Sequence, residues 1–298
     1  MLKLSVIGTG YLGATHAAAM SSLGFSVVGI DVDQAKVESL RQGKVPFFEP
    51  ELDELLAKEI QSGRLTFSTN FSDAADCDVH FICVGTPQKK DSLAADLSYV
   101  DASVEALAPH AKSGSLVVGK STVPVGTAAR LSSLLVKINP SVELAWNPEF
   151  LREGFAVEDT LRPNRLVVGV ASDRAEEILK EVYAPLIANN VPWIRADLAT
   201  AELVKVAANS FLATKISFIN AMAEICEVAG GDVTVLAKAI GYDPRIGSRF
   251  LQAGIGFGVD AYPKIFELSW HDLKNSAPGN LSSSCVKLTP STSALVRE

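Results

Sequence analysis

Hydrophobic positions along the chain form short apolar runs that alternate with segments of helical periodicity. Apolar runs of strand length lie at residues 4–7, 25–30, 65–68, 78–84, 115–120, 142–146, 165–170 and 191–194. Between them, helices are predicted in the alanine-rich stretch after residue 13 and at residues 34–41, 51–62, 97–107, 128–136 and 174–186. Strands that alternate with helices predict an α/β fold with a doubly wound parallel sheet of the Rossmann type.

The pattern changes near residue 199, where one long helix is predicted over Ala199–Ala229 and ended by Gly230 and Gly231. Its apolar side chains fall on more than one face, and a helix apolar on several faces has to be covered on several faces. We therefore expect two domains, 1–198 and 199–258, and a homodimer formed through this helix.

A glycine turn joins the first strand to the first helix and reads Gly8-Thr9-Gly10-Tyr11-Leu12-Gly13. In this context Gly8 permits the tight turn, Gly10 lets the backbone approach a pyrophosphate, and Gly13 lets helix and strand pack closely. The helix N-terminus supplies amide donors and a positive dipole. The turn predicts a bound dinucleotide.

Asp31 ends the second strand about 20 residues after the turn, where a carboxylate accepts from an adenosine ribose 2′-hydroxyl. NAD is therefore favoured over NADP, whose 2′-phosphate meets Asp31 as a like charge. Lys36 is the nearby cation, and it either reaches the ribose or is an exposed helix lysine. Thr86 follows a buried strand at the carboxyl edge of the sheet, where it either reaches the cofactor or caps its own turn.

The composition is that of a globular protein, with 48% hydrophobic and 20% charged residues in a chain of 298. A net charge of −7 argues against a nucleic-acid partner. Because no apolar run reaches membrane-spanning length and the N-terminus leads directly into a strand, we expect a cytoplasmic protein without a membrane partner. The cysteines show no paired spacing and make no metal-ligand cluster with the histidines, which predicts free thiols and no metal. They are Cys77, Cys83, Cys226 and Cys285.

Five motifs in order resemble the UDP-glucose/GDP-mannose dehydrogenase family over residues 1 to about 258: VIGTGYLG, DVHFICVGTP, GKSTVPVGT, WNPEFLREGFAVEDTLRPNRLVVG and AELVKVAANSFLATKISFINAMAEIC. The resemblance implies an NAD-dependent oxidoreductase. Such enzymes oxidise the C6 alcohol of a sugar nucleotide to a carboxylate in two hydride transfers with a cysteine thioester between them. UDP-glucose, giving UDP-glucuronate, is the expected substrate. GDP-mannose or a UDP-N-acetylhexosamine is the alternative.

The resemblance also assigns roles to individual residues. It places Thr122, Glu149 and Glu153 at the reacting end, with Glu153, Thr122 and a water transferring protons. From the residues alone, the two carboxylates are either such groups or solvated loop charges. Lys205 and Asn209, one turn apart on the long helix, suit stabilisation of an oxyanion. Taken alone, such a pair is usually at the surface, but the apolar neighbours on the helix favour the functional interpretation.

Further binding residues follow from the same resemblance. Thr122 and Glu153 also face the cofactor, as does Lys264. The substrate is expected to contact the segment Glu149, Phe150, Leu151, Arg152 and Glu153, the helix residues Lys205 and Asn209, and the loop residues Phe250, Leu251, Gln252, Ala253, Gly254 and Gly258.

The chain departs from the family after Gly258. Where the family has a motif like GFGGGCLPKD, this chain reads GFGVDAYPKI, so that Ala261 and Ile265 replace the catalytic cysteine and aspartate. Restoring one G before suitable codons for Val259–His271 gives GGCLPKDIRAFMA, which indicates a single-base deletion and a frameshift. We expect residues 259–298 to be a poorly ordered tail, the C-terminal UDP-binding domain to be absent, and this chain to be inactive. A non-catalytic protein that binds NAD or dimerises is the alternative.

Overall fold

The computed structural model describes residues 1–90 and 94–254, which divide into two units. The first unit comprises Met1–Lys89 and Ala95–Lys205, and the second contains Lys90–Ala94 and the chain from Val206 onwards. The long helix α9 (Leu198–Ala229) passes from the first unit into the second. The expectations for Gly258, Ala261, Lys264, Ile265 and the tail concern residues outside the described ranges.

The first unit contains an eight-stranded sheet with the order β3-β2-β1-β4-β5-β6-β7-β8 in the described part of the chain. The strands from β1 to β6 all run parallel, as expected for a doubly wound sheet. They are β1 (Lys3–Ile7), β2 (Ser26–Ile30), β3 (Leu65–Ser68), β4 (Val79–Ile82), β5 (Leu116–Gly119) and β6 (Glu143–Trp146). The predicted fold class is confirmed.

The last two strands differ from the all-parallel prediction. Strand β7 (Leu166–Gly169) meets β6 in antiparallel pairing through Trp146 and Gly169, and β8 (Trp193–Ala196) runs parallel to β7. Helix α6 (Ala156–Leu161), in the connection between β6 and β7, has only six residues. A parallel strand needs a crossover that returns the chain along the sheet, and a helix of fewer than two turns is too short for that.

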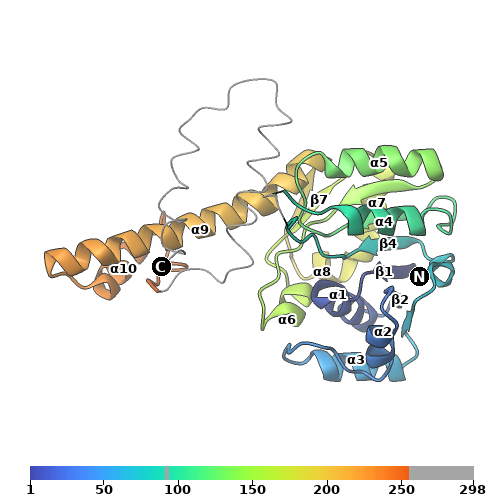
Figure 1. The fold of residues 1–298 in the computed structure, drawn as a ribbon, viewed down its shortest axis with the longest axis horizontal. Coiled ribbons are helices and arrows are strands. Elements are labelled where there is room, and N and C mark those ends of the chain that lie inside the picture. Colours follow the sequence, from blue (N-terminus) through green and yellow to red (C-terminus); the bar gives the residue numbers. More distant parts are fainter. Residues whose placement is uncertain (91–93, 255–298) are drawn as a thin grey trace. The chain divides into compact units, whose positions relative to one another are not determined.

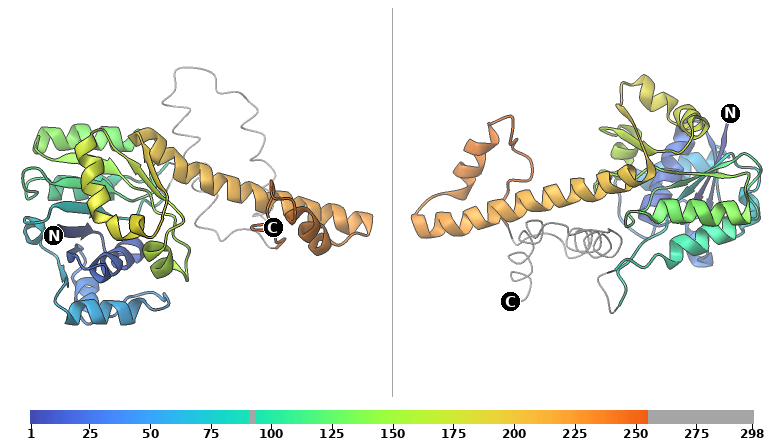
Figure 2. Two further views of the ribbon diagram at one scale, coloured as in Figure 1. Left: turned by 180° about the vertical axis from the view of Figure 1, so that it is seen from behind. Right: turned by 90° about the horizontal axis from the view of Figure 1, so that it is seen from above.

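Helices cover both faces of the sheet (Figures 1 and 2). One apolar cluster lies under α1 (Tyr11–Ser22), α2 (Gln34–Arg41), α3 (Leu52–Gln61), α6, α7 (Asp173–Val182) and α8 (Ala184–Ala188). The other lies under α4 (Ser98–Leu107), α5 (Thr127–Ile138), the short 3-10 helix Phe71–Ala74 and the start of α9. The single helix predicted over 174–186 is two helices, because Pro185 lies in the first turn of α8 and has no N–H to continue α7.

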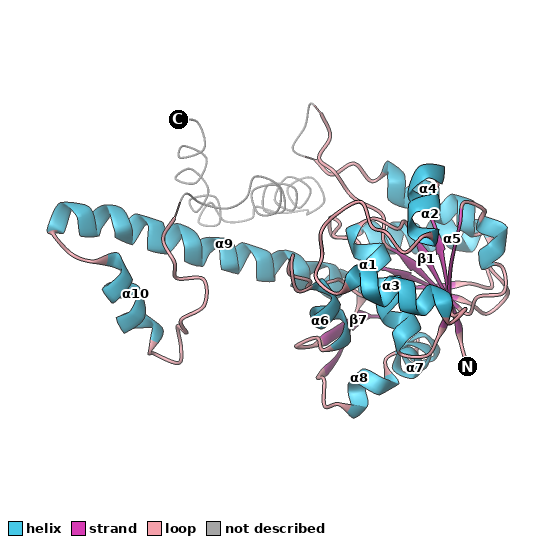
Figure 3. Cartoon of the chain, turned by 90° about the horizontal axis from the view of Figure 1, so that it is seen from below, coloured by secondary structure: helices cyan, strands magenta, loops and turns pink. Residues whose placement is uncertain are grey.

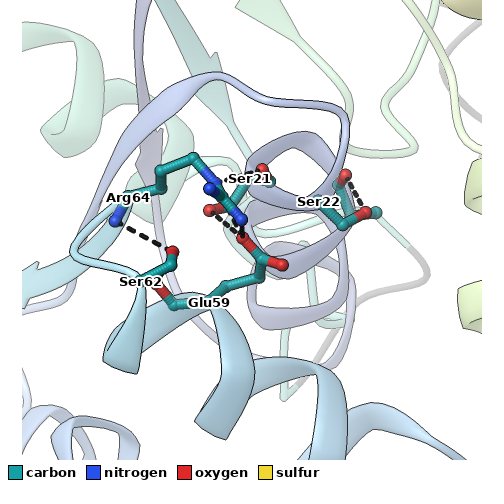
Figure 4. A network of polar contacts seen from close by, with 6 residues as sticks. Ser21, Ser22, Glu59, Ser62 and Arg64 are labelled. Atoms are coloured by element: carbon teal, nitrogen blue, oxygen red, sulfur yellow. Dashed lines mark hydrogen bonds and ion pairs between the residues drawn. The ribbon is translucent and has the colours of Figure 1, made fainter.

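A buried carboxylate holds α3 against α1 (Figure 4). Glu59 is 1% exposed, and its Oε2 accepts hydrogen bonds from Ser21 Oγ at 3.1 Å, Arg64 Nη2 at 2.8 Å and Arg64 Nε at 3.0 Å. The hydrogen bonds from Ser21 and Arg64 offset the unfavourable free energy of burying the Glu59 charge. This network lies at the C-terminal end of α1, whereas the glycine turn precedes its N-terminal end.

In the second unit, α9 ends at Gly230, whose positive φ of 74° allows Gly231 N to donate to Cys226 O at 2.8 Å. Helix α10 (Val233–Gly241), which was not predicted as a separate helix, follows directly and is capped by Asp232. The chain then returns to α9, where Lys215 Nζ donates to Ile246 O at 3.0 Å and Gly254 N to Asn220 Oδ1 at 3.0 Å (Figure 3). Within residues 1–90 and 94–254, no helix has the length and hydrophobicity needed to cross a membrane.

Candidate functional site

The predicted site residues of the first unit follow the carboxyl ends of parallel strands. Asp31 follows β2, Thr86 follows β4, Thr122 follows β5 and Glu149 follows β6. Because β1, β2, β4, β5 and β6 are parallel, these ends meet at one edge of the sheet (Figure 1). The edge that binds ligands in open α/β folds therefore carries the predicted chemistry.

Two glycines of the turn are required by the packing of the protein itself. Gly8 has a φ of 85°, and its N–H donates to Ile30 O at 2.7 Å. A Cβ on Gly13 would stand 1.8 Å from Gly8 O, far inside van der Waals contact. These two positions fix the turn and the approach of α1 to β1.

Gly10 is different, because a Cβ at this position would meet no heavy atom within 4 Å. Helix α1 begins directly after Gly10 and has no side-chain cap. The amide groups of its first turn, from Tyr11 to Gly13, lack intrahelical acceptors and are available to an anion. The space and the donors both fit the pyrophosphate of a dinucleotide.

Asp31 is buried and supplies a fixed acceptor beside the turn. Its Oδ2 accepts from Thr9 N at 2.8 Å, Thr9 Oγ1 at 3.0 Å and Lys36 Nζ at 2.8 Å, whereas Oδ1 accepts from Asp33 N at 3.1 Å. Burial acts to raise the pKa of Asp31, but the bonds from Lys36, Thr9 and Asp33 outweigh it and lower the pKa below its ordinary value. The carboxylate is ionised, and Oδ1 has acceptor capacity for a ribose hydroxyl.

The loops after β4 and β5 are joined by hydroxyl groups. Thr86 Oγ1 donates to Thr122 O at 2.7 Å, and Ser121 Oγ donates to Val84 O at 2.6 Å. The structure therefore brings the two predicted threonines together. Thr86 uses its proton to hold the backbone of the residue that is expected to act in proton transfer.

A buried lysine fixes the start of the loop that carries Glu149. Lys120 Nζ donates to Asn147 Oδ1 at 2.9 Å, and Tyr183 Oη donates to the same oxygen at 2.6 Å. Asn147 Nδ2 in turn donates to Val167 O at 2.8 Å. Burial lowers the pKa of Lys120 to about 8. We refer to residues 147–155, which carry the predicted catalytic residues Glu149 and Glu153, as the catalytic loop.

Within the catalytic loop, Glu149 pairs with the predicted helix lysine. Its Oε1 lies 2.8 Å from Lys205 Nζ, and its Oε2 accepts from Leu151 N at 2.6 Å. Lys205 is only 7% exposed and lies 5.5 Å from the centroid of the Phe150 ring. Asn209 follows Lys205 by one turn on α9 and belongs to the second unit.

The other charged residues of the catalytic loop differ in their contacts. Glu153 is exposed, and its charge adds to burial and to Glu49 in raising the pKa of Tyr11. Arg152 instead forms a two-bond pair with Asp159, from Nε to Oδ2 at 2.9 Å and from Nη2 to Oδ1 at 2.7 Å. This pair holds the catalytic loop against α6.

Glu202, two turns before Asn209 on α9, caps helix α5. It is 2% exposed, and its two carboxylate oxygens accept from Gly126 N and Ala128 N, each at 2.7 Å. Burial raises the pKa of Glu202 to about 7, against the lowering effect of the two amide bonds. Glu202 thus fixes the first turns of α9, from which Lys205 projects, against the segment after Thr122.

The predicted substrate loop lies in the second unit. Phe250 has a φ of 63° and is 38% exposed, whereas Leu251 is buried. Gln252, Ala253 and Gly254 are exposed, with Gly254 N held by Asn220 as described above.

Three charged residues that frame the site had not been singled out from the sequence: Glu49, Lys120 and Glu202. Their only signal in the sequence is local: each is a charged residue next to an apolar run or a strand end. That signal alone does not distinguish a site residue from a surface charge. Their partners are distant in sequence, with Glu202 bonded to residues 74 and 76 positions away. Their roles depend on the tertiary structure.

Comparison with protein families identifies both parts of the chain. Residues 2–187 match the NAD binding domain of the UDP-glucose/GDP-mannose dehydrogenase family, and residues 199–286 match its central domain.

Individual relatives agree with these matches. The chain is 45% identical over 268 residues to the UDP-glucose 6-dehydrogenase of Rhizobium meliloti, covering 88% of this chain and 61% of that protein. It is 43% identical over 267 residues to UDP-glucose 6-dehydrogenase YwqF of Bacillus subtilis, covering 88% and 60%. The chain thus spans about 60% of the length of these curated relatives.

Solved structures show the same fold. A UDP-glucose dehydrogenase from the archaeon Pyrobaculum islandicum superimposes with a TM-score of 0.89 at 39% identity, covering 97% of this chain and 67% of that one. A GDP-mannose dehydrogenase from Pseudomonas aeruginosa superimposes with a TM-score of 0.79 at 31% identity, covering 99% and 69%.

Proposed function

The chain belongs to the UDP-glucose/GDP-mannose dehydrogenase family, and on that premise we propose that it is the NAD-binding and central portion of an enzyme that oxidises UDP-glucose to UDP-glucuronate. Members of the family are NAD-dependent sugar-nucleotide dehydrogenases. The resemblance to proteins named for UDP-glucose supports that substrate. GDP-mannose, the substrate in the name of one structural relative, is the alternative.

The single observation that carries the proposal is the open space at Gly10 beside the ionised Asp31. The amides of α1 bind the pyrophosphate, and Asp31 Oδ1 accepts from the ribose. When bound, NAD accepts hydride from the alcohol carbon of the substrate. Lys36 keeps Asp31 oriented through its 2.8 Å ion pair.

At the reacting end, the chain supplies charges and proton acceptors. Glu149 holds the Lys205 ammonium in a buried position, where it stabilises negative charge on a substrate oxygen together with Asn209. Glu153 and Thr122 transfer the alcohol proton through a water. The substrate loop Phe250–Gly254 binds the sugar nucleotide.

The apolar surface of α9 and α10 favours a homodimer formed through α9. Side chains more than 45% exposed include Phe211, Phe218, Ile225, Val228 and Val235. A second copy that covers them removes a large apolar area from water. Sedimentation of the purified chain as a monomer at assay concentrations would contradict this proposal.

We also propose that this chain does not complete the oxidation, because Ala261 and Ile265 replace the cysteine and the aspartate. Without a thiolate, no thioester forms between the two hydride transfers. The purified 298-residue chain, incubated with NAD and UDP-glucose, is expected to release no UDP-glucuronate detectable by chromatography.

The matched control is a chain whose frame is restored to read GGCLPKD from residue 259. UDP-glucuronate released by the 298-residue chain as fast as by an active restored chain would contradict the proposal. Sequencing the gene across the codons for Gly258–Asp260 tests the deletion itself, and a neighbouring frame without the family motif would refute it.

A further inference from the structure

Glu49 joins three segments that are distant in sequence. It lies between α2 and α3 and is 5% exposed. Its Oε2 accepts from Tyr11 Oη at 2.5 Å and from Gly154 N at 2.9 Å, and its Oε1 accepts from Ala156 N at 2.8 Å. The carboxylate therefore connects the glycine turn to the end of the catalytic loop.

The Tyr11 end of this connection borders the predicted pyrophosphate site. Tyr11 is the first residue of α1 and follows Gly10 directly. Burial, the hydrogen bond to Glu49 and the charge of Glu49 raise the pKa of Tyr11 above its ordinary value, so the phenol keeps its proton and donates. The Phe47 ring, with its centroid 5.1 Å from that of Tyr11, holds the tyrosine ring on one side.

The Gly154 end controls the shape of the catalytic loop. Gly154 has a φ of 82°, and Ala156 is the first residue of α6. The residue at the N-cap, Phe155, provides no side-chain acceptor, so Glu49 caps α6 from a distant segment. The loop is fixed at its other end by Lys120 through Asn147. Glu149 and Glu153 lie between these two attachments.

One oxygen, Oε2, accepts from both Tyr11 and Gly154. Any displacement of the tyrosine at the turn therefore changes the acceptor that holds the catalytic loop.

We propose that Glu49 is a positioning residue that couples the glycine turn to the catalytic loop, so that a cofactor bound at Gly10 orders the loop carrying Glu149 and Glu153. The proposal rests on NAD binding at the turn, as inferred above. Because such coupling is reciprocal, an ordered loop also favours the bound cofactor.

Hydrogen exchange of the full chain, followed by mass spectrometry with and without saturating NAD, tests the coupling. Tyr11→Phe removes the donated proton and keeps the ring. Glu49→Gln keeps the shape and replaces one acceptor oxygen by an amide donor. Tyr99→Phe, at an exposed tyrosine of α4, and Glu59→Gln, at the buried carboxylate of Figure 4, are the matched controls.

In the wild-type chain and in both controls, NAD is expected to slow exchange of the amides in residues 147–156 by at least about threefold. In Tyr11→Phe and Glu49→Gln with NAD bound, this slowing is expected to disappear, whereas the wild-type melting transition is retained in Tyr11→Phe because Glu49 keeps two of its three donors. If Tyr11 and Glu49 only stabilised the fold, their variants would change the exchange rate of the loop amides without NAD. Bound NAD would then still slow that exchange.

Equal slowing by bound NAD in the wild-type chain, Tyr11→Phe and Glu49→Gln would overturn the coupling and leave the proposed function standing. The coupling would also be overturned if bound NAD did not slow amide exchange in residues 147–156 of the wild-type chain. Failure of the wild-type chain to bind NAD would overturn the proposed function and, with it, this proposal.

Discussion

Replacing Gly10 by valine is expected to lower the affinity for NAD by at least about 100-fold, which is about 2.7 kcal/mol of binding free energy. A Cβ at Gly10 meets no protein atom within 4 Å, so the valine side chain occupies the space that the pyrophosphate needs. The φ of −71° and ψ of −160° at Gly10 suit a residue with a side chain. We therefore expect the free energy of unfolding to change by less than about 1 kcal/mol. Calorimetric titration and denaturant unfolding of the same preparation measure the two effects.

Gly13→Ala provides the contrast within the same turn. Its Cβ would stand 1.8 Å from Gly8 O, so the backbone of α1 or of the turn has to move. Overpacking of this kind is expected to lower the free energy of unfolding by about 3 kcal/mol. Undiminished NAD binding by Gly10→Val would show that the cofactor does not approach the backbone at this position.

Glu202→Gln is expected to remove a pH dependence of stability. The pKa of Glu202 is about 7 in the folded chain, against an ordinary value of 4.5, because the carboxyl is buried. The folded state therefore keeps this proton where the unfolded state has lost it. The stabilising contribution is complete below the unfolded pKa and is lost as the pH rises through about 7. Because glutamine does not ionise, Glu202→Gln does not lose stability in this way as the pH rises.

The measurement compares urea unfolding of the wild-type chain and Glu202→Gln over a range of pH. From about pH 5.5 to about pH 8.5, the stability of the wild-type chain relative to the variant is expected to fall by about 2 kcal/mol. The other titrating groups, such as His16 and His80, whose pKa values burial lowers, are present in both chains and cancel in the difference. Two stability curves that stay parallel over this range would exclude an elevated pKa at Glu202.

The local pattern of the sequence was sufficient for the first six strands and most helices. The segments 34–41 and 65–68 coincide with α2 and β3 residue for residue, since amphipathic periodicity and apolar runs are local signals. The direction of β7 and β8 was not predictable in this way, because it depends on the path of the connection after β6 rather than on the strands themselves. The break before α8 carries a local signal, Pro185, that the apolar periodicity of 174–186 outweighed.

The site was predictable where strand order alone determined position. Asp31, Thr86, Thr122 and Glu149 meet at one edge because parallel strands end there. The direction of each side chain was not predictable, as Arg152 shows by pairing with Asp159. Glu49 could not be linked to the catalytic loop from sequence, because its partners Gly154 and Ala156 are 105 and 107 residues away.

Parallel calorimetric titrations of the purified 298-residue chain with NAD and with NADP test the assignment of the cofactor site most directly. We predict saturable binding of NAD and an affinity for NADP at least about tenfold weaker, since a 2′-phosphate meets the ionised carboxylate of Asp31 as a like charge. Binding of neither dinucleotide, or binding of NADP as tightly as NAD, would contradict the assignment.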